Sequence, residues 1–411
     1  MRRARPAPRG MRHASLARPG EPGGLGRIRL AVIAVFAVHG FIFASWAVRV
    51  PAVKQQTGAS SAALGFALLG LSAGAVATMV IAGALCRRFG SSRLAVVSCA
   101  LLSVTLVLPP LAHSAMALGL ALLVFGAAYG CLNVAMNSIA VDRVAALRRP
   151  VMPGFHAAWS FGGLAGAGLG GLLAPHLSPA RDLALVALAG LLVTAVAGRT
   201  LITGAVPGFA AEEESASSRP ARAWRGPRGI LRTGRTVGLF GLIALCTAYD
   251  EGAIGDWSAL HLRQDLGASA SLAAAGYAAF TLAEATGRLS GTTLIERLGR
   301  TRVLVLGGLT ACAGMLAASL APDVAVALAG FAATGAGLAN LFPAAMASAG
   351  RLAGSDGVVI ASTLGYSGFL LGPPAIGLLA SQFGLRAGLV TLSFLALAAA
   401  VIAYQARSAD I

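Results

Sequence analysis

The chain has 411 residues, of which 57% are hydrophobic and only 11% are charged, and its formal net charge is +17. A soluble domain carries about 25% charged residues, so this composition excludes an ordinary soluble protein and indicates an integral membrane protein. The chain contains a single lysine, Lys54, which is followed by Gln55. A nucleotide-binding P-loop needs lysine followed by serine or threonine, so the sequence encodes no motor driven through such a loop.

Apolar segments of about 20 residues recur along the chain, and each is long enough to cross a bilayer as a helix. Residues 1–29, rich in arginine, proline and glycine, precede them and are predicted to form a disordered cytoplasmic tail. The predicted spans are 30–50, 62–85, 93–112, 116–140, 151–175, 182–203, 236–259, 270–291, 302–321, 324–349, 357–381 and 385–405. The predicted fold is therefore an all-α membrane protein with twelve transmembrane helices.

The predicted spans divide into two six-helix halves, 30–203 and 236–405. A cytoplasmic linker at 204–235 joins the halves, and a short cytoplasmic tail follows at 406–411. The basic part of the linker is expected to lie on anionic lipid.

Basic residues are concentrated in alternate loops between the predicted spans. With the N-terminus placed in the cytoplasm, the inside loops hold seventeen basic residues and the outside loops hold five. The positive-inside rule then places both termini in the cytoplasm. The net positive charge is thus a topology signal, and no nucleic-acid partner is expected.

The two halves repeat each other in sequence. Residues 58–60 read Gly-Ala-Ser and match residues 267–269 at an offset of 209, while Asn133 matches Asn340 at an offset of 207. Such a slowly drifting offset indicates that a six-helix unit was duplicated in parallel orientation. Parallel repeats are typical of transporters whose substrate site lies between the two halves.

The loops after the second and eighth predicted spans carry a related motif at 83–93 and 296–302. The motif resembles the Gly-x-x-x-Asp-Arg-x-Gly-x-Arg signature of the major facilitator superfamily, and the resemblance extends over about residues 28–405. Arg87 stands where that family usually has an acid. The resemblance implies that these cytoplasmic loops set the balance between inward- and outward-open states, through Arg87, Arg88, Arg93, Glu296, Arg297 and Arg302.

Further motifs resemble a bacterial branch related to the fucose permease. They are found at 46–51, 133–137, 149–160, 256–258 and 364–374. This resemblance implies a secondary transporter, with sugars among the candidate substrates. The coupling carboxylates of fucose-type permeases do not carry over, because the first span has His39 and the fourth has Asn133 and Asn137. The drug-antiporter signature Gly-x-x-x-Gly-Pro-x-x-Gly is missing from the fifth span.

Four carboxylates lie inside predicted spans, where an ionised group costs roughly 2.5–3.5 kcal/mol at the helix centre on insertion scales. Glu284 has Arg288 four residues on, which predicts an i,i+4 pair near the cytoplasmic end. We group this pair with the cytoplasmic gating loops. Asp256 lies near the outer end, either facing Arg263 or capping backbone. Asp250 and Glu251 lie nearer mid-membrane with no basic residue close in sequence.

Glu251 is the favoured proton-coupling residue, and the repeat suggests a partner for it. His39-Gly40 and Glu251-Gly252 occupy similar places in the two halves, and each pair is followed by a tryptophan, Trp46 or Trp257. We therefore expect His39 and Glu251 to form a couple across the central cavity. The alternative is that His39 is hydrogen-bonded inside the N-terminal half. The further candidates for substrate contact, proton coupling or helix packing are Asp250, Asp256, Trp46, Trp257, Asn133, Asn137, His156, Asn340 and Tyr366.

The sequence thus predicts a transporter that moves a small polar solute by alternating access with proton coupling. It is expected to be a monomer in the cytoplasmic (inner) membrane of a bacterium, in contact with lipid, substrate and protons, and without cofactor or metal. A proton-driven efflux antiporter and a transporter-like receptor or sensor are the alternatives. An intramembrane serine protease is excluded, because its histidine would follow Ser367, whereas the last histidine is His261.

Overall fold

The structure is a computed structural model that describes residues 22–147, 152–203 and 227–409. The N-terminal half comprises α1 (Pro22–Ala47), α2 (Val50–Thr57), α3 (Ser61–Phe89), α4 (Ser91–Thr105), the 3₁₀ turn η1 (Pro109–Leu111), α5 (Ala115–Leu147), α6 (Met152–Leu173) and α7 (Pro179–Thr203). The C-terminal half comprises α9 (Pro227–Gln264), α10 (Ala270–Leu298), α11 (Arg300–Ser319), α12 (Val324–Leu338), α13 (Leu341–Phe383), α14 (Leu385–Gln405) and the 3₁₀ turn η2 (Ala406–Ala409). Most of the predicted tail and linker, at 1–21 and 204–226, lies outside the described residues.

Ten helical segments of the described chain are long and apolar enough to cross a membrane, and α6 and α10 are the two further long helices. One of the ten, Val324–Gly354, combines α12 with the first part of α13. The helix α13 breaks at Gly354, where φ is +60°, and Gly357–Phe383 forms the next span. Every predicted span therefore falls on a helix, and the predicted all-α fold class is confirmed.

Helix ends differ from the predicted ends on one side of the bundle. The helix α1 begins at Pro22 rather than at residue 30, and α9 begins at Pro227 rather than at residue 236. Apolar runs report only where a helix is in lipid, whereas helical hydrogen bonds continue into water. Both helices begin with proline, which fits the first turn because its missing N–H has no helical partner there.

The two halves share local structure at the positions where their sequences match. Ser60 caps α3 by accepting a hydrogen bond from the Ala63 N–H, and Ser269 caps α10 in the same way with Leu272. The junction glycines Gly90 and Gly299 have φ values of +85° and +79°, in the left-handed region that favours glycine. The predicted repeat is thus visible in the backbone as well as in the sequence.

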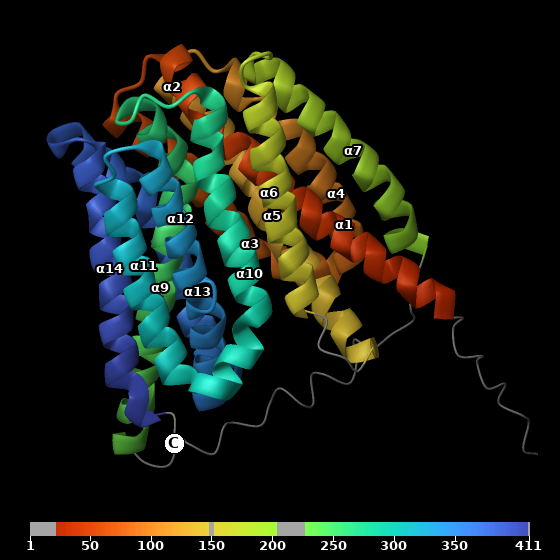
Figure 1. The fold of residues 1–411 in the computed structure, drawn as a ribbon. Helices are drawn as coiled ribbons and strands as arrows, with labels where there is room; N and C mark the ends of the chain where they lie inside the picture. Colours follow the sequence, from red (N-terminus) through yellow and green to blue (C-terminus); the bar gives the residue numbers. More distant parts are fainter. Residues whose placement is uncertain (1–21, 148–151, 204–226, 410–411) are drawn as a thin grey trace, which may run out of the picture.

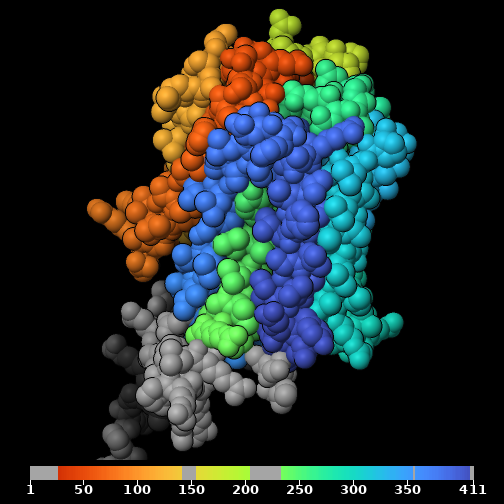
Figure 2. Space-filling view, turned by 90° about the vertical axis from the view of Figure 1, so that its left-hand side faces the viewer, coloured from red at the N-terminus to blue at the C-terminus, as the bar shows by residue number. Residues whose placement is uncertain are grey.

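The two halves meet through α3 against α13 and through α6 against α10. Figure 1 shows α2 at one end of the bundle, which we call the α2 face. At the opposite end, the terminal face, α1 begins and α14 ends. In Figure 2, α2 covers the α2 face above α13 and α14. The helix α2 also contacts α9 of the other half.

Close contacts join the halves near the α2 face. The Ser271 hydroxyl of α10 donates a 2.7 Å hydrogen bond to the carbonyl oxygen of Gly171 in α6. A side chain on Gly65 of α3 would meet the Pro373 carbonyl oxygen at 2.6 Å and the Gly377 Cα at 2.9 Å. The backbones of α3 and α13 thus approach so closely that only glycine fits, and the molecule is closed at this face.

Gly65→Leu is expected to open the α2 face. Overpacking costs about 1–3 kcal/mol, which would shift the equilibrium toward the open state by about 5- to 150-fold. The distance between spin labels at Gln55 of α2 and Arg263 of α9 should increase. Gly168→Leu is the matched control, because a side chain at Gly168 meets nothing within 4 Å. An unchanged label distance in Gly65→Leu would contradict this account of the closure.

A buried ion pair fastens the turn between α1 and α2 to the start of α7. The Arg49 Nε donates to an Asp182 carboxylate oxygen at 2.6 Å, and the two side chains are 3% and 0% exposed. The Arg49 guanidinium also contacts the carbonyl oxygen of Ala174, at 3.5 Å. The pair lies at the α2 face and holds the N-terminal half together there.

Candidate transport site

A central cavity lies between the two halves, with about 700 Å³ of space not filled by protein atoms. Its wall combines a few polar groups with many aromatic rings, contributed by α1, α3, α5 and α6 from one half and α9, α10 and α13 from the other. The lining residues are Phe43, Leu71, Ser72, Ala75, Val76, Met79, Tyr129, Asn133, Trp159, Glu251, Gly252, Tyr277, Phe280, Glu284, Tyr366 and Phe369. A cavity between two repeats is the expected place for a transported solute.

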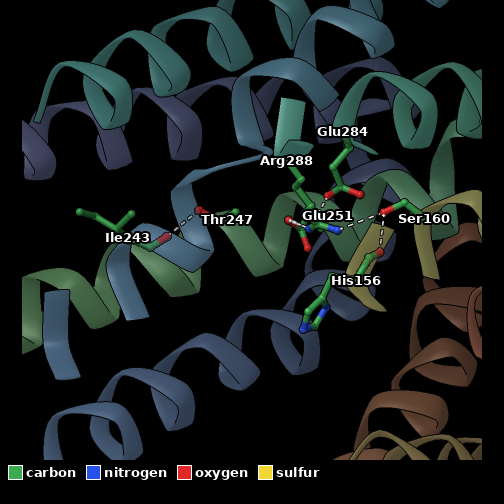
Figure 3. Close-up of polar contacts among 7 residues, drawn as sticks. All are labelled: His156, Ser160, Ile243, Thr247, Glu251, Glu284 and Arg288. Atoms are coloured by element: carbon green, nitrogen blue, oxygen red, sulfur yellow. Dashed lines mark hydrogen bonds and ion pairs between the residues drawn. The ribbon is translucent and has the colours of Figure 1, made fainter. Parts of the chain in front are cut away.

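Two lining carboxylates share one arginine. The Arg288 Nη2 donates to Glu284 at 2.8 Å and to Glu251 at 3.2 Å, as Figure 3 shows. The Arg288 Nη1 lies 3.4 Å from the Ser160 hydroxyl of α6, and Ser160 donates to the carbonyl oxygen of His156. Three helices, α9, α10 and α6, thus converge on one guanidinium. We call Glu251, Glu284 and Arg288 the acid–arginine cluster.

The acid–arginine cluster bridges the two halves, because Ser160 belongs to the N-terminal half and the charged groups belong to the C-terminal half. Glu284 is 2% exposed, whereas Glu251 and Arg288 are 17% and 18% exposed. Glu251 and Glu284 both line the cavity, and Glu251 is the more exposed of the two carboxylates. A contact to α6 means that relative movement of the halves changes the surroundings of the arginine.

The predicted contact between Glu284 and Arg288 is present, but its place differs from the expected one. Glu284 lies in the middle of α10, which spans residues 270–298, and it lines the central cavity. The predicted grouping of the pair with the cytoplasmic gating loops is therefore corrected. Sequence reasoning missed that Arg288 is also the partner of Glu251. The signal for it was an arginine inside the predicted span 270–291.

The structure does not show the expected couple between His39 and Glu251. The His39 Nδ1 accepts a 3.0 Å hydrogen bond from the Trp159 indole N–H of α6, and its ring stacks on Tyr129 at 4.0 Å. His39 is 1% exposed. The alternative position inside the N-terminal half is thus the one observed. The repeat places His39 and Glu251 at similar depths, but Tyr129 and Trp159 occupy the wall beside His39.

Asp250 and Asp256 are buried but do not line the central cavity. One Asp250 oxygen has no hydrogen-bond partner among the described residues. Asp256 was expected either to face Arg263 or to cap backbone, but Arg263 donates instead to the carbonyl oxygen of Ala268. The three acids of α9 therefore do not act as one group, and Glu251 alone reaches the cavity.

Of the remaining candidate residues, some line the cavity and others make contacts within or between helices. Tyr366 and Asn133 line the cavity. Asn137 donates to the Asn133 side chain at 2.8 Å, and Asn340 donates to the carbonyl oxygen of Gly287 at 3.0 Å, linking the end of α12 to α10. The His156 ring packs edge-on against Phe36.

Both candidate tryptophans are core residues. Trp46 and Trp257 are fully buried and do not line the cavity. The sequence pattern that made them candidates reflects the repeated packing of α1 and α9.

The candidate gating residues are exposed at the terminal face. They flank the turns between α3 and α4 and between α10 and α11, and they are Arg87, Arg88, Arg93, Glu296, Arg297 and Arg302. Their gating role stays a prediction. Within the described part of the chain, no group of three or more His, Cys, Asp or Glu side chains could hold a metal ion.

Comparison with known proteins decides the family. The sequence profile of the Major Facilitator Superfamily matches residues 31–250 and 240–409 of this chain. The chain belongs to this superfamily. It is 33% identical over 370 residues to an uncharacterised MFS-type transporter of Yersinia pestis, covering 89% of this chain and 92% of that protein. It is 34% identical over 363 residues to the membrane protein MosC of Rhizobium meliloti, covering 88% of this chain and 85% of that protein.

Solved structures of two other transporters share the fold. A bacterial homologue of the human lysosomal transporter Spinster, in an inward-facing and unoccupied conformation, matches with a TM-score of 0.73 and 16% identity, over 95% of this chain and 98% of that chain. The nucleoside transporter NupG matches with a TM-score of 0.67 and 13% identity, over 93% and 98% of the two chains. This superfamily member is therefore a multi-pass membrane transport protein with a small-molecule substrate, and not an enzyme.

Proposed function

We propose that this protein moves a small polar solute across the bacterial cytoplasmic (inner) membrane by alternating access, and that protons drive the movement. The acid–arginine cluster on the cavity wall carries this proposal. Ionisable groups inside a membrane are costly and mark substrate pathways or proton relays unless they serve packing alone. This cluster is open to the cavity and contacts both halves, which is the position that a coupling site needs.

The positive-inside bias supports a cytoplasmic position for the terminal face. The contacts of Gly65 and Ser271 close the opposite face. We therefore infer an inward-facing conformation, in which the cavity would exchange solute with the cytoplasmic side. Opening of the α2 face, by separation of α3 from α13 and of α6 from α10, would expose the same cavity to the outside.

Glu251 is the residue that we expect to exchange the proton. It is 17% exposed on the cavity side and lies 3.2 Å from Arg288, whereas Glu284 is 2% exposed and lies closer to the arginine, at 2.8 Å. A proton on Glu251 would weaken its contact with Arg288, because a neutral carboxyl group holds a cation less strongly. The guanidinium would then be free to pair with Glu284 and Ser160.

The resemblance to the fucose-permease branch stays a prediction, as do the sugar-like substrate and the monomeric state. NupG, which shares the fold, is a nucleoside transporter, and a shared fold does not by itself select the solute.

Purified protein in proteoliposomes should accumulate a solute only when a pH gradient is imposed. A panel of sugars, nucleosides, amines and known export substrates is tested with the gradient in both directions. A gradient of one pH unit supplies about 1.4 kcal/mol per proton, which supports roughly tenfold accumulation. Collapse of the gradient by an ionophore is the control. Solute movement that does not depend on the gradient would contradict proton coupling. If no solute of the panel moved, the receptor alternative would be favoured.

A further inference from the structure

The charges on the cavity wall do not balance. Glu251 and Glu284 carry two negative charges when ionised, and Arg288 supplies one positive charge to both. The ionisable groups among the lining residues are carboxylates and tyrosines, with no basic side chain. An excess charge held away from water is costly unless it is paired. One more positive charge, from a proton or from a bound cation, is therefore needed to neutralise the cavity wall.

The neighbouring titratable groups do not supply that charge. The His39 Nδ1 accepts a hydrogen bond from the Trp159 indole N–H, so His39 is neutral as it stands. His156 contacts the cluster through its backbone carbonyl oxygen, which accepts from Ser160, and its ring packs against Phe36 instead. Asp250, next to Glu251 in the chain, is itself an acid and is buried away from the cavity. The remaining titratable groups of the cavity wall are tyrosines, which are neutral phenols: Tyr129 from α5, Tyr277 from α10 and Tyr366 from α13.

Aromatic rings surround the two carboxylates. Seven of the lining residues are aromatic, from both halves of the protein: Phe43, Tyr129, Trp159, Tyr277, Phe280, Tyr366 and Phe369. Aromatic faces attract organic cations through the ring quadrupole, and aromatic cages recognise quaternary ammonium groups. Rings and carboxylates together suit a ligand that has a positive charge and an apolar body.

Three polar groups of the wall are engaged by other parts of the protein. The Ser72 hydroxyl donates to the carbonyl oxygen of Phe369, and the Trp159 N–H donates to His39. The Asn133 side-chain oxygen accepts from Asn137. A sugar that left its water shell would lose these three groups as hydrogen-bond partners, and any hydroxyl left unpaired would weaken binding.

We propose that the cavity binds an organic ammonium cation, and that this cation and one proton compete for the same excess negative charge. This inference rests on the proposed transport function and narrows it to exchange. Binding of the cation releases one proton from the acid–arginine cluster, and uptake of a proton releases the cation. For a monovalent cation, one positive charge moves each way per cycle, so exchange is electroneutral.

Benzyltrimethylammonium is a suitable probe, because its charge does not change with pH. Its binding to the purified protein is measured by titration calorimetry at several pH values and in buffers of different ionisation heat. One proton should be released per bound cation, and affinity should rise about tenfold per pH unit across the range in which the cluster is protonated. His113→Asn, an exposed histidine on the turn before α5, is the control and should leave both results unchanged.

Choline and 3,3-dimethylbutan-1-ol form a matched pair, because the second replaces the charged nitrogen of choline by carbon. Choline should compete with benzyltrimethylammonium at millimolar concentration, and the neutral alcohol should not. Equal competition by the two would overturn the proposal, because shape and not charge would then decide binding.

Two variants distinguish an effect of the net charge of the cluster from the loss of one specific contact. Glu251→Gln leaves one carboxylate and one arginine, so cation affinity should fall at least tenfold and proton release should disappear. The double variant Glu251→Gln with Arg288→Gln restores one excess negative charge and should recover cation binding. The proposal would be overturned if Glu251→Gln still bound the cation and still released a proton. It would also be overturned if the proton release depended on His156.

Failure of this inference is distinguishable from failure of the transport proposal. If a neutral solute accumulates with the pH gradient while neither ammonium probe binds at millimolar concentration, the cation inference is wrong and proton-driven transport stands. If both probes bind with proton release but no solute or probe crosses the membrane, the binding inference stands and the transport proposal is wrong.

Discussion

Arg288→Gln is expected to abolish proton-driven transport and to destabilise the protein. Removal of the guanidinium leaves Glu284, which is 2% exposed, and Glu251 without a cation. Loss of one partner from a buried ion pair costs about 3–5 kcal/mol. Uptake in proteoliposomes and unfolding in mixed micelles measure the two effects. A variant that retains wild-type uptake would show that the arginine is not part of the coupling site.

A double variant separates the effect of Arg288 on stability from its effect on transport. The double variant Glu284→Gln with Arg288→Gln removes one charge of each sign, so most of the lost stability should return while gradient-driven uptake stays impaired. Arg297→Gln, an exposed arginine on the same helix, is the control for stability and should change it by less than about 0.5 kcal/mol.

Arg49→Met is expected to lower the free energy of unfolding by about 3–5 kcal/mol, because it leaves the fully buried Asp182 carboxylate without its cation. Arg181→Met is the matched control, since Arg181 is exposed beside Asp182. The measurement is denaturant-driven unfolding in mixed micelles, followed by circular dichroism.

The double variant Arg49→Met with Asp182→Leu tests the cause. Replacement of both partners by apolar groups is often neutral or stabilising, so the double variant should unfold within about 1 kcal/mol of the original protein. The difference between the double variant and the sum of the two single variants gives the coupling energy of the pair. Additive losses would show that the two side chains act independently.

The fold could be predicted because each of its determinants is local in sequence. Apolar length identifies a membrane helix, and the caps Ser60 and Ser269 with the glycines Gly90 and Gly299 mark helix ends at matching positions. The early starts of α1 and α9 could not be predicted from hydropathy, because those turns leave the lipid without leaving the helix.

The site could be predicted only in part, because its contacts join residues far apart in the chain. Glu251 was recognised as an acid in a span, but its partner Arg288 lies on α10, thirty-seven residues on. The symmetry argument selected His39 instead, since it compares depth along α1 and α9 and says nothing of the direction in which a side chain points. Trp159 decides that direction by its hydrogen bond.

The aromatic wall was also missed by sequence reasoning. Tyr129 lies on α5, and Tyr277 and Phe280 lie three residues apart on α10. Both helices are rich in other apolar residues, so no spacing distinguishes these rings from core aromatics. Only the assembly of α5, α10 and α13 shows that the rings surround one cavity.

Glu251→Gln tests the central claim most directly, when exchange and accumulation are measured on the same proteoliposomes. Exchange of labelled for unlabelled solute needs only alternating access, whereas accumulation needs the coupled proton. We predict that the variant retains exchange and loses the accumulation driven by the pH gradient. A variant that accumulates solute to the wild-type level under the same gradient would show that Glu251 does not carry the coupled proton.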